Sequence, residues 1–504
     1  ALAETLNADF STPQWSTKLA GFYYDKTSNI YFHTVNTDPA NDQFIYSDNG
    51  WYCHGEVTSS GNYLIITQSQ GTSSKCRVLV RELATDAKTV SWLFPTANAV
   101  YDYICESDGV LYFRTSLDAP KGYIIKMDLK DRAHYSEVVA QSEDTLANVY
   151  CVRDKLFVAY LRNGHSIVKV FGLDGQSLAQ IELPGEGTAM AFRADATEKG
   201  VLFAYSDYVT PPELLRYDLA GESKNWTSTV VYRPKLPFDL SQFKQEVVVY
   251  KSKDGTLVPM TLAYRKDLVK DGNNPVFLYG YGGFGINLTP FYRNSYATWL
   301  RLGGVLAVPN LRGGAENGEA WHEAGTKLKK QNVFDDCRAA AHWLIDQKYT
   351  SAGKIALSGA SNGGLLVGAV LTQEPELFGA ALPHVGVLDM IRFPLFAVGS
   401  GWKPDYGDPA NQDECKALLS YSPYHNVRQG TQYPAVLVST CDHDDRVEQA
   451  HSWKFAAALQ YAQAADRPVL LLVGKDAGHL YGWTTSKTLA WDADRFAFVL
   501  DNLR

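Results

Sequence analysis

The chain has 504 residues, of which 45% are hydrophobic and 20% are charged. This composition is ordinary for a folded globular protein and excludes wholesale disorder. The length favours roughly two to four domains over a single core. No apolar run approaches the roughly 18–20 residues of a membrane-spanning helix, so we expect no association with a membrane. The formal net charge is −8 and no basic stripe is visible, which argues against nucleic-acid binding.

The seven cysteines are widely spaced, and no two of them form a Cys-x-x-Cys pair. Their odd number and spacing argue against a disulfide framework or a zinc site and favour a reducing compartment. No signal peptide is visible, so we expect a cytoplasmic protein, with the periplasm as the alternative in a bacterium. Two sequons, at Asn225 and Asn287, are interpreted as chance matches rather than glycosylation sites.

The first part of the chain consists of short predicted strands separated by turn pairs such as Asp108-Gly109 and Asp174-Gly175. Its strands recur with a period of roughly 40–50 residues, about four to a unit, which is typical of propeller blades. A β-sandwich is the competing interpretation, but it leaves the repeat unexplained. We therefore predict a partial β-propeller of about four to five blades over residues 1–235. A partial unit is expected near residues 19–38, followed by four complete units at Trp51–Pro95, Ala99–Gln141, Leu146–Pro184 and Gly187–Tyr232.

From about Ser241 the pattern changes to apolar strands without alternation, separated in the later part by segments of helical length. This pattern predicts an α/β domain over residues 236–504, with a mostly parallel sheet buried on both faces. The expected strands include Glu246–Tyr250, Val276–Gly280, Gly304–Pro309, Lys354–Ser358, Ala435–Thr440 and Val469–Val473. The expected helices are Asn332–Gln347, Asn362–Thr372, Glu448–Tyr461 and Ser486–Leu503.

The most specific motif is Gly359-Ala-Ser361-Asn-Gly363, which lies between an expected strand and an expected helix. A Gly-x-Ser-x-Gly motif in this context predicts a serine nucleophile on a sharp turn. Small neighbours allow the turn, and the helix N-terminus behind the serine favours the negative charge of an oxyanion. The alternative, a chance glycine-rich turn, does not account for the context.

A serine nucleophile requires a base and a group that orients the base, and in α/β-hydrolases the chain order is Ser, Asp or Glu, then His. Asp444 follows one expected strand and His479 follows the next, which is the strand end where such folds place their chemistry. Asp442 and Asp445 compete with Asp444 for the orienting role. Each residue alone is also compatible with an ordinary position in a turn or a charged loop.

Several motifs in the same order and spacing resemble those of the prolyl oligopeptidase family of post-proline serine peptidases. The resemblance extends from about Phe238 to the C-terminus and weakly into the repeats. It rests on Tyr279–Phe284, Asn310–Gly314, Gly359–Gly364, Trp402–Gly407, Asp442–Val447 and Ala477–His479. Several independent motifs in order are far more specific than any one of them.

The resemblance implies a catalytic triad of Ser361, Asp444 and His479. It also implies an oxyanion hole made by the backbone N–H of Asn362 and the hydroxyl of Tyr281. In this family a tryptophan stacks on the substrate proline within an apolar pocket, and an arginine binds a substrate carbonyl. The matching pocket residues are Phe284, Val387, Trp402, Tyr406 and Val447, and the matching arginine is Arg446.

The chain departs from the family pattern in three places. The loop Gly313-Gly-Ala-Glu-Asn317 differs from the usual Gly-Gly-Gly-Glu-Tyr of the family. Leu480-Tyr481-Gly482-Trp483 follows the histidine where the family has small residues, which puts the shape of that loop in question. The family also has an N-terminal arm and further blades, so we expect this chain to represent only part of such a protein.

The predicted function is therefore a serine-type oligopeptidase that cleaves short peptides after proline, acts as a monomer and uses no metal or cofactor. The alternatives are a related α/β-hydrolase peptidase or esterase of other specificity, and a catalytically inactive hydrolase–propeller scaffold.

Overall fold

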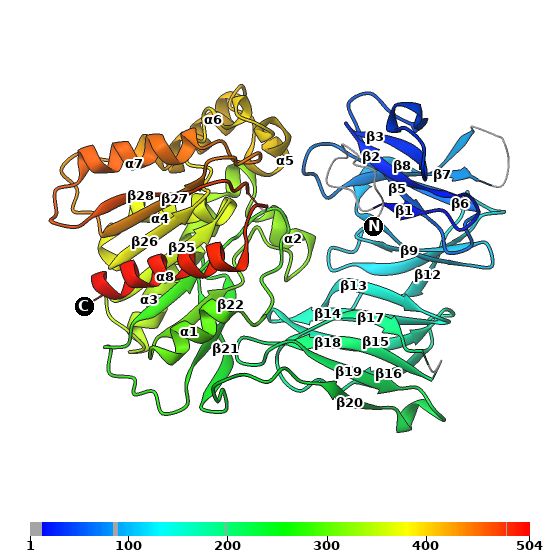
Figure 1. Ribbon diagram of the computed structural model, residues 1–504, viewed down its shortest axis with the longest axis horizontal. Helices are drawn as coiled ribbons and strands as arrows, with labels where there is room; N and C mark the ends of the chain where they lie inside the picture. The colour runs from blue at the N-terminus through cyan, green and yellow to red at the C-terminus, as the bar shows by residue number, and fades with distance from the viewer. Residues whose placement is uncertain (1–12, 84–88, 197–198, 480, 504) are drawn as a thin grey trace. The chain divides into compact units, whose positions relative to one another are not determined.

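The computed structural model describes residues 13–83, 89–196, 199–479 and 481–503. Within its N-terminal part, five sheets of four strands each follow one another along the chain (Figure 1). The first two sheets contain β1 (Gln14–Trp15), β2 (Gly21–Lys26), β3 (Asn29–Thr34), β4 (Gln43–Tyr46), β5 (Tyr52–Val57), β6 (Tyr63–Ser69), β7 (Cys76–Glu82) and β8 (Val90–Ala99). The third and fourth contain β9 (Tyr101–Ser107), β10 (Val110–Thr115), β11 (Tyr123–Asp128), β12 (Ser136–Val139), β13 (Thr145–Val152), β14 (Lys155–Arg162), β15 (His165–Gly172) and β16 (Ser177–Ile181). The fifth contains β17 (Thr188–Ala194), β18 (Gly200–Ser206), β19 (Glu213–Asp218) and β20 (Thr227–Tyr232).

The four complete repeats expected from the sequence each coincide with one of these sheets. The turn residues fit this arrangement, since Asp108 and Gly109 both have positive φ, 51° and 80°, as a tight hairpin turn requires. The expected partial unit was wrong in one respect, because β1 and β4 complete it to four strands. The sequence hides these two strands because β1 is only two residues long and β4 has no buried residue.

The chain divides into two compact units, Ala1–Val158 with Val170–Ser177, and Ala159–Lys169 with Leu178–Arg504. The second unit contains the fifth four-stranded sheet together with the whole α/β region. The domain boundary that the sequence predicts after residue 235 lies inside the second unit and stays a prediction.

The α/β region is built on an eight-stranded sheet in the order β21-β22-β24-β23-β25-β26-β27-β28. Its strands are β21 (Phe243–Lys251), β22 (Leu257–Arg265), β23 (Val276–Tyr279), β24 (Val305–Pro309), β25 (Ile355–Ala360), β26 (Ala380–His384), β27 (Ala435–Cys441) and β28 (Val469–Gly474). β22 runs antiparallel to β21 and β24, and all other neighbours are parallel. The expected strands are all present, and β22 and β26 are additional to them.

Helices cover both faces of this sheet, as its apolar strands require. They are α1 (Asn294–Arg301), α2 (Glu319–Glu323), α3 (Gln331–Asp346), α4 (Asn362–Gln373), α5 (Lys403–Tyr406), α6 (Gln412–Tyr421), α7 (Ala450–Ala462) and α8 (Thr485–Asn502). Short 3₁₀ turns are η1 (Pro39–Asn41), η2 (Ser223–Asn225), η3 (Lys327–Lys329), η4 (Pro375–Leu377), η5 (Phe393–Leu395), η6 (Gly399–Trp402) and η7 (Tyr424–Asn426). The four expected helices match α3, α4, α7 and α8 to within about two residues, the usual uncertainty of helix ends.

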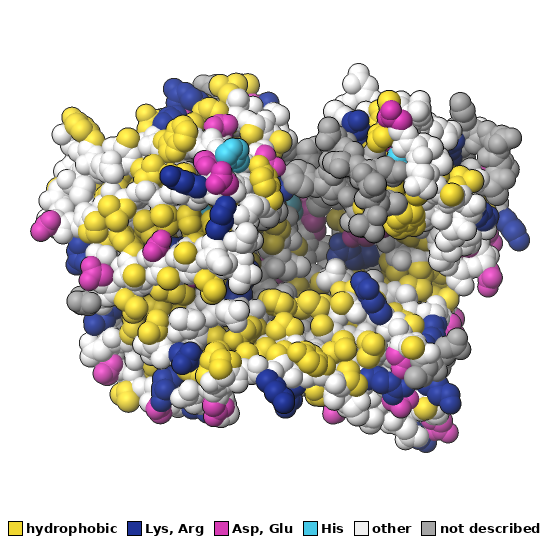
Figure 2. Space-filling view, viewed as in Figure 1, with side chains coloured by type: hydrophobic (Ala, Val, Ile, Leu, Met, Phe, Trp, Pro, Cys, Tyr) yellow, Lys and Arg dark blue, Asp and Glu magenta, His cyan; other side chains and the backbone are white. Residues whose placement is uncertain are grey.

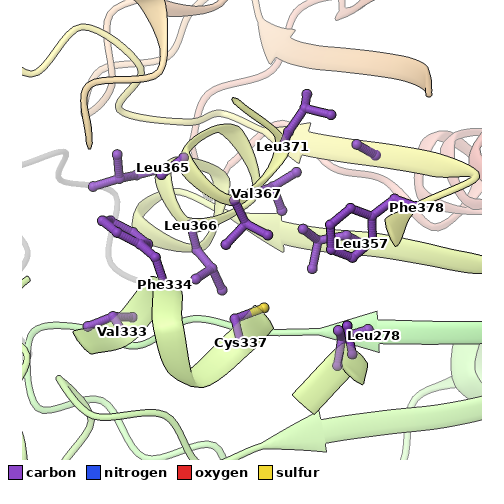
Figure 3. Packing of buried hydrophobic residues seen from close by; sticks show 14 of the residues in the cluster. Leu278, Val333, Phe334, Cys337, Leu357, Leu365, Leu366, Val367, Leu371 and Phe378 are labelled. Atoms are coloured by element: carbon purple, nitrogen blue, oxygen red, sulfur yellow. The ribbon is translucent and has the colours of Figure 1, made fainter. Parts of the chain in front are cut away.

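Consecutive residues of β23 point to opposite faces of the sheet and pack in two different cores. Leu278 of β23 packs with α3 and α4, whereas Phe277 packs on the opposite face with α1 and α8. Figure 3 shows the first core, where Phe334 and Cys337 of α3 lie close to Leu366 of α4.

β28 forms one edge of the sheet, and its Leu470 and Leu471 side chains are exposed. Figure 2 shows hydrophobic side chains on the surface around β28 and α8. Of the helices in the described part of the chain, none combines the length and the apolar character that crossing a membrane requires.

Candidate active site

Ser361 lies on the sharp turn between β25 and α4. Its backbone has φ 60° and ψ −118°, a strained conformation for a residue with a side chain. The Ser361 N–H donates to the carbonyl of His384 at 2.8 Å, which fixes the turn against the end of β26. This is the strand–turn–helix geometry that presents a serine hydroxyl at the carboxyl edge of the sheet.

The glycines beside the serine are required by close backbone approach. A Cβ on Gly359 would lie 2.3 Å from the carbonyl oxygen of Gly363, and a Cβ on Gly363 would lie 2.5 Å from that of Gly280. Gly364 is equally restricted, since its Cβ would lie 2.5 Å from Cα of Gly386. The backbones are therefore too close for any side chain at these positions.

His479 and Asp444 form a buried pair at the same edge of the sheet. Nδ1 of His479 lies 2.9 Å from Oδ2 and 3.0 Å from Oδ1 of Asp444. Asp444 also accepts the backbone N–H groups of Arg446 at 3.0 Å and Val447 at 2.9 Å. A carboxylate at this distance favours the tautomer with the proton on Nδ1, which leaves Nε2 free to act as a general base.

The two other candidate carboxylates have different surroundings. Asp442 accepts the N–H groups of Asp476 at 3.0 Å and Ala477 at 3.2 Å, so it supports the loop that carries His479. Its hydrogen bond with His443 lowers the pKa of Asp442 to about 2. Asp445 is exposed. Of the three, only Asp444 is in hydrogen-bond contact with the His479 ring in the described structure.

The side chain of Asn362 joins two of the predicted site residues. Its Nδ2 donates to the carbonyl of Tyr281 at 2.6 Å, and its Oδ1 accepts the Tyr406 hydroxyl at 3.0 Å. Burial raises the pKa of Tyr281 to about 12, although the nearby Ser361 side chain acts to lower it. Tyr281 therefore keeps its proton at neutral pH and can donate it in a hydrogen bond. Arg446 is half-buried, and its charge acts on Tyr281.

The predicted aromatic residues come together with one that the sequence did not indicate. Phe284 and Tyr406 meet edge to face at 5.2 Å between ring centroids, and Trp402 and Tyr406 at 6.3 Å. Phe393 of η5 completes the group, stacked on Trp402 at 6.4 Å and 13°. Val387 and Val447 are buried in the same apolar cluster. Trp402 itself is 8% exposed.

The unusual residues after His479 stabilise a closed turn. The Gly478 N–H donates to the carbonyl of Tyr481 at 3.0 Å, and the Tyr481 hydroxyl donates to the carbonyl of His443 at 2.7 Å. Trp483 donates from Nε1 to the Gly478 carbonyl at 3.3 Å. Leu480 lies outside the described residues. The large side chains thus tie the histidine loop to its surroundings where small residues were expected.

His384 is a further residue that the sequence did not single out. Its ring is hydrogen-bonded to Ser439 Oγ at 3.0 Å, and burial, with the nearby charges of Arg495 and His479, lowers the pKa of His384 to about 3. The ring is therefore neutral at physiological pH, next to the triad candidates. No motif in the sequence marks this position.

The chain is similar to known proteins over nearly its whole length. Residues 2–229 match the model of the prolyl oligopeptidase N-terminal β-propeller domain, and residues 291–504 match that of the prolyl oligopeptidase family. A prolyl endopeptidase of Elizabethkingia meningoseptica is 37% identical, over 99% of this chain and 73% of that protein. A dual function macrocyclase-peptidase POPB of Galerina marginata is 34% identical, over 97% of this chain and 71% of that protein.

Solved structures give the same result. One from a structural and mechanistic analysis of two prolyl endopeptidases has a TM-score of 0.92 and 35% identity, over 98% of this chain and 74% of that chain. Prolyl oligopeptidase B of Galerina marginata, bound to a 35mer hydrolysis and macrocyclization substrate, has a TM-score of 0.93 and 32% identity, over 98% of this chain and 72% of that chain. Sequence, fold and the serine elbow therefore agree, and the chain belongs to the prolyl oligopeptidase family of serine peptidases, with an N-terminal β-propeller and an α/β-hydrolase catalytic domain.

Proposed function

We propose that this chain is a serine oligopeptidase that hydrolyses short peptides on the C-terminal side of proline. The observation that carries the proposal is the buried His479–Asp444 pair, 2.9 Å apart, at the same sheet edge as the strained Ser361 turn. We propose a propeller domain over residues 1–235 and a catalytic domain over residues 236–504. We further propose that the protein is a monomer of the cytoplasm that binds neither nucleic acid nor membranes.

In the first half of the reaction, the Ser361 Oγ attacks the carbonyl carbon of the proline residue while His479 Nε2 takes the hydroxyl proton. The C–O bond forms, and the carbonyl electron pair moves onto oxygen. When the tetrahedral species collapses, the C–N bond breaks and His479 returns the proton to the leaving amine. Asp444 holds the ring and stabilises its cation.

In the second half, a water molecule takes the place of the amine. His479 Nε2 removes a proton from the water as the oxygen attacks the ester carbonyl. The ester C–O bond then breaks, and Ser361 Oγ recovers the proton from His479. The products are a peptide ending in proline and the regenerated serine. These steps use only groups of the chain and the two substrates.

The backbone N–H of Asn362 and the hydroxyl of Tyr281 are the proposed oxyanion hole. The tetrahedral oxygen carries a full negative charge, so two fixed donors stabilise it more than they stabilise the ground-state carbonyl. Burial keeps Tyr281 protonated, as this role requires.

Trp402, Phe284, Val387, Tyr406 and Val447 are the proposed proline pocket. A proline ring is rigid and apolar, so flat aromatic faces and buried valines match it without ordering a flexible side chain. Arg446 is proposed to bind the carbonyl of the residue before proline. The mixture of aromatic and aliphatic walls does not suit a charged side chain at this position.

The proposal is tested by labelling with a fluorophosphonate and by turnover of a chromogenic proline peptide. The parent protein should be labelled and active, whereas Ser361→Ala should be neither. Ser351→Ala, in the turn that precedes β25, is the control and should behave as the parent. Hydrolysis by Ser361→Ala at the parent rate would contradict the mechanism. A parent that binds proline peptides without labelling or turnover would support the inactive scaffold instead.

A further inference from the structure

Next to the Tyr281–Phe284 loop, four ionisable side chains form a continuous network: the half-buried Glu319 and the buried His322, Asp405 and Lys330. His322 contacts Glu319 through Nδ1 at 3.3 Å and Asp405 through Nε2 at 2.8 Å. Asp405 in turn lies 3.5 Å from Lys330 Nζ. Burying charged side chains costs desolvation free energy even when they are paired, so this network requires an explanation.

Asp405 is at the centre of this network and contacts the Tyr281–Phe284 loop directly. Its Oδ1 accepts the backbone N–H of Phe284 at 3.0 Å. Lys330 binds the same loop from the other side, with Nζ donating to the carbonyl of Gly282 at 2.9 Å. The side chains of Asp405 and Lys330 are 2% and 1% exposed, so water does not replace these contacts.

The bond to Phe284 holds a strained residue. Phe284 has φ 57°, in the left-handed region that side chains other than glycine rarely occupy. Such a conformation persists only where surrounding contacts determine it. The carboxylate of Asp405 supplies one of those contacts, because it fixes the direction of the Phe284 N–H.

Asp405 also belongs to the helix that carries Tyr406, the residue that faces Phe284 in the proposed proline pocket. It lies in α5, immediately before Tyr406, and α5 follows directly on η6, which ends at Trp402. One carboxylate therefore joins the backbone of Phe284 to the helix that bears Tyr406. The Phe284 and Tyr406 rings, whose centroids are 5.2 Å apart in an edge-to-face contact, thus belong to the two segments that Asp405 connects.

The charged groups of this network shift one another's pKa values. Burial acts to raise the pKa of Asp405, but Lys330 and His322 outweigh it and leave that pKa below its usual value. Burial acts to lower the pKa of His322, but the two carboxylates raise it to about 9. At neutral pH Asp405 is thus an anion paired with the His322 cation, and an anionic carboxylate is the form that binds an N–H most strongly. Burial acts in the opposite direction on Lys330 and lowers its pKa.

We propose that Asp405 is a positioning residue for proline selectivity: by binding the Phe284 N–H from α5, it fixes the distance between the two aromatic walls of the proline pocket. The inference rests on the proposed function and assigns Asp405 no contact with substrate. When the walls of a pocket that fits a rigid ring shift, kcat/KM for a proline substrate falls. A substrate with a smaller residue at the cleaved position, such as alanine, is less affected, so the preference for proline decreases.

The test compares kcat/KM for two chromogenic peptides that differ only in proline or alanine at the cleaved position. The ratio of the two values does not depend on how much of a preparation is active, so partial unfolding alone leaves it unchanged. In Asp405→Asn, an amide NH₂ must face either a cationic donor or the Phe284 N–H. We expect its proline-to-alanine ratio to fall by roughly tenfold or more.

Asp335→Asn is the matched control. Asp335 is a largely buried carboxylate of α3, paired with Arg338 at 3.3 Å and remote in sequence from the pocket loop. Its substitution should leave the ratio unchanged. His322→Gln serves as the second variant if Asp405→Asn does not fold, because it keeps a donor to Asp405 and removes the charge. We expect its ratio to fall in the same direction by a smaller factor.

Each outcome decides one point. An unchanged ratio in a folded Asp405→Asn protein, or in His322→Gln where only that variant folds, overturns the inference while leaving the proposed function intact. A fall in the ratio for Asp335→Asn as large as that for Asp405→Asn also overturns it. A parent enzyme that shows no preference for proline overturns the proposed function and this inference together.

Discussion

The hydroxyl of Tyr406 donates to Oδ1 of Asn362 across 3.0 Å, and this bond joins the proposed proline pocket to the residue that follows the nucleophile. The same Asn362 side chain donates to the carbonyl of Tyr281 at 2.6 Å. A side chain of the motif itself thus links the pocket wall with the loop of the proposed oxyanion donor. The proposed proline pocket and the proposed oxyanion hole therefore depend on the same amide side chain.

Removing the Tyr406 hydroxyl should therefore reduce both stability and turnover. Tyr406→Phe leaves a buried amide oxygen without its donor, which costs about 1–3 kcal/mol in the free energy of unfolding. Urea denaturation measures this value. Tyr421→Phe is the control, because the buried Tyr421 hydroxyl has no hydrogen-bond partner among the described residues. If both variants lose the same stability, the bond to Asn362 contributes nothing.

The carboxylate that orients His479 is identified by comparing neighbouring aspartates. Asp444→Asn should lower kcat by roughly 10⁴-fold, because an amide favours the wrong imidazole tautomer and cannot stabilise the cation. The exposed Asp445 provides the control, and Asp445→Asn should keep nearly full activity. A large loss in Asp445→Asn with a small one in Asp444→Asn would exchange the two assignments. Steady-state turnover of a proline peptide is the measurement.

Trp402 tests whether the aromatic group recognises proline or only packs. Its stacking on Phe393 and its 8% exposure are compatible with either role. If it contacts the substrate ring, Trp402→Ala should lower the kcat/KM preference for proline over alanine by roughly tenfold. Trp343→Ala, which removes a ring stacked on Tyr349 at 5.8 Å, should destabilise without changing that preference. Equal preference in both variants would make Trp402 a core residue.

His322 predicts a specific dependence of stability on pH. Its pKa is raised from 6.5 to about 9 in the folded protein, so the folded state holds the proton more tightly than the unfolded state. The resulting stabilisation is complete below about pH 6.5 and is lost as the pH rises through about 9. We expect the difference in unfolding free energy between the parent and His322→Gln to shrink over this range by about 1–3 kcal/mol. Urea titrations at several pH values measure it, and parallel curves would contradict it.

The sequence predicts those features that repeat or that lie at strand ends. The apolar strands fix the sheet, and the position of Ser361 between a strand and a helix identifies the elbow because that local pattern needs no tertiary information. Their places after strands make Asp444 and His479 candidates only. At the level of the sequence, the choice of Asp444 over Asp442 and Asp445 rests on the family resemblance, because side-chain direction is not visible there. Only the three-dimensional structure shows that Asp442 supports the loop.

Other parts of the site leave no local trace in the sequence. Phe393 reads as an ordinary apolar residue, and its place beside Trp402 depends on how the segment after β26 folds back. Asp405, His322 and Lys330 come from three separate segments and meet only after folding, so no spacing rule connects them. Likewise, β1 contributes two residues to its sheet, which is too short for any periodicity.

The close contacts of Gly359, Gly363 and Gly364 affect what a Gly-x-Ser-x-Gly motif indicates when it is found in a homologue. Their Cβ positions are blocked by backbone atoms, whatever residue occupies position 361. A homologue that had lost its chemistry would therefore keep these glycines for as long as it kept its shape. The glycines therefore report on the fold alone, whereas activity is expected only where the proposed triad of Ser361, Asp444 and His479 is also present.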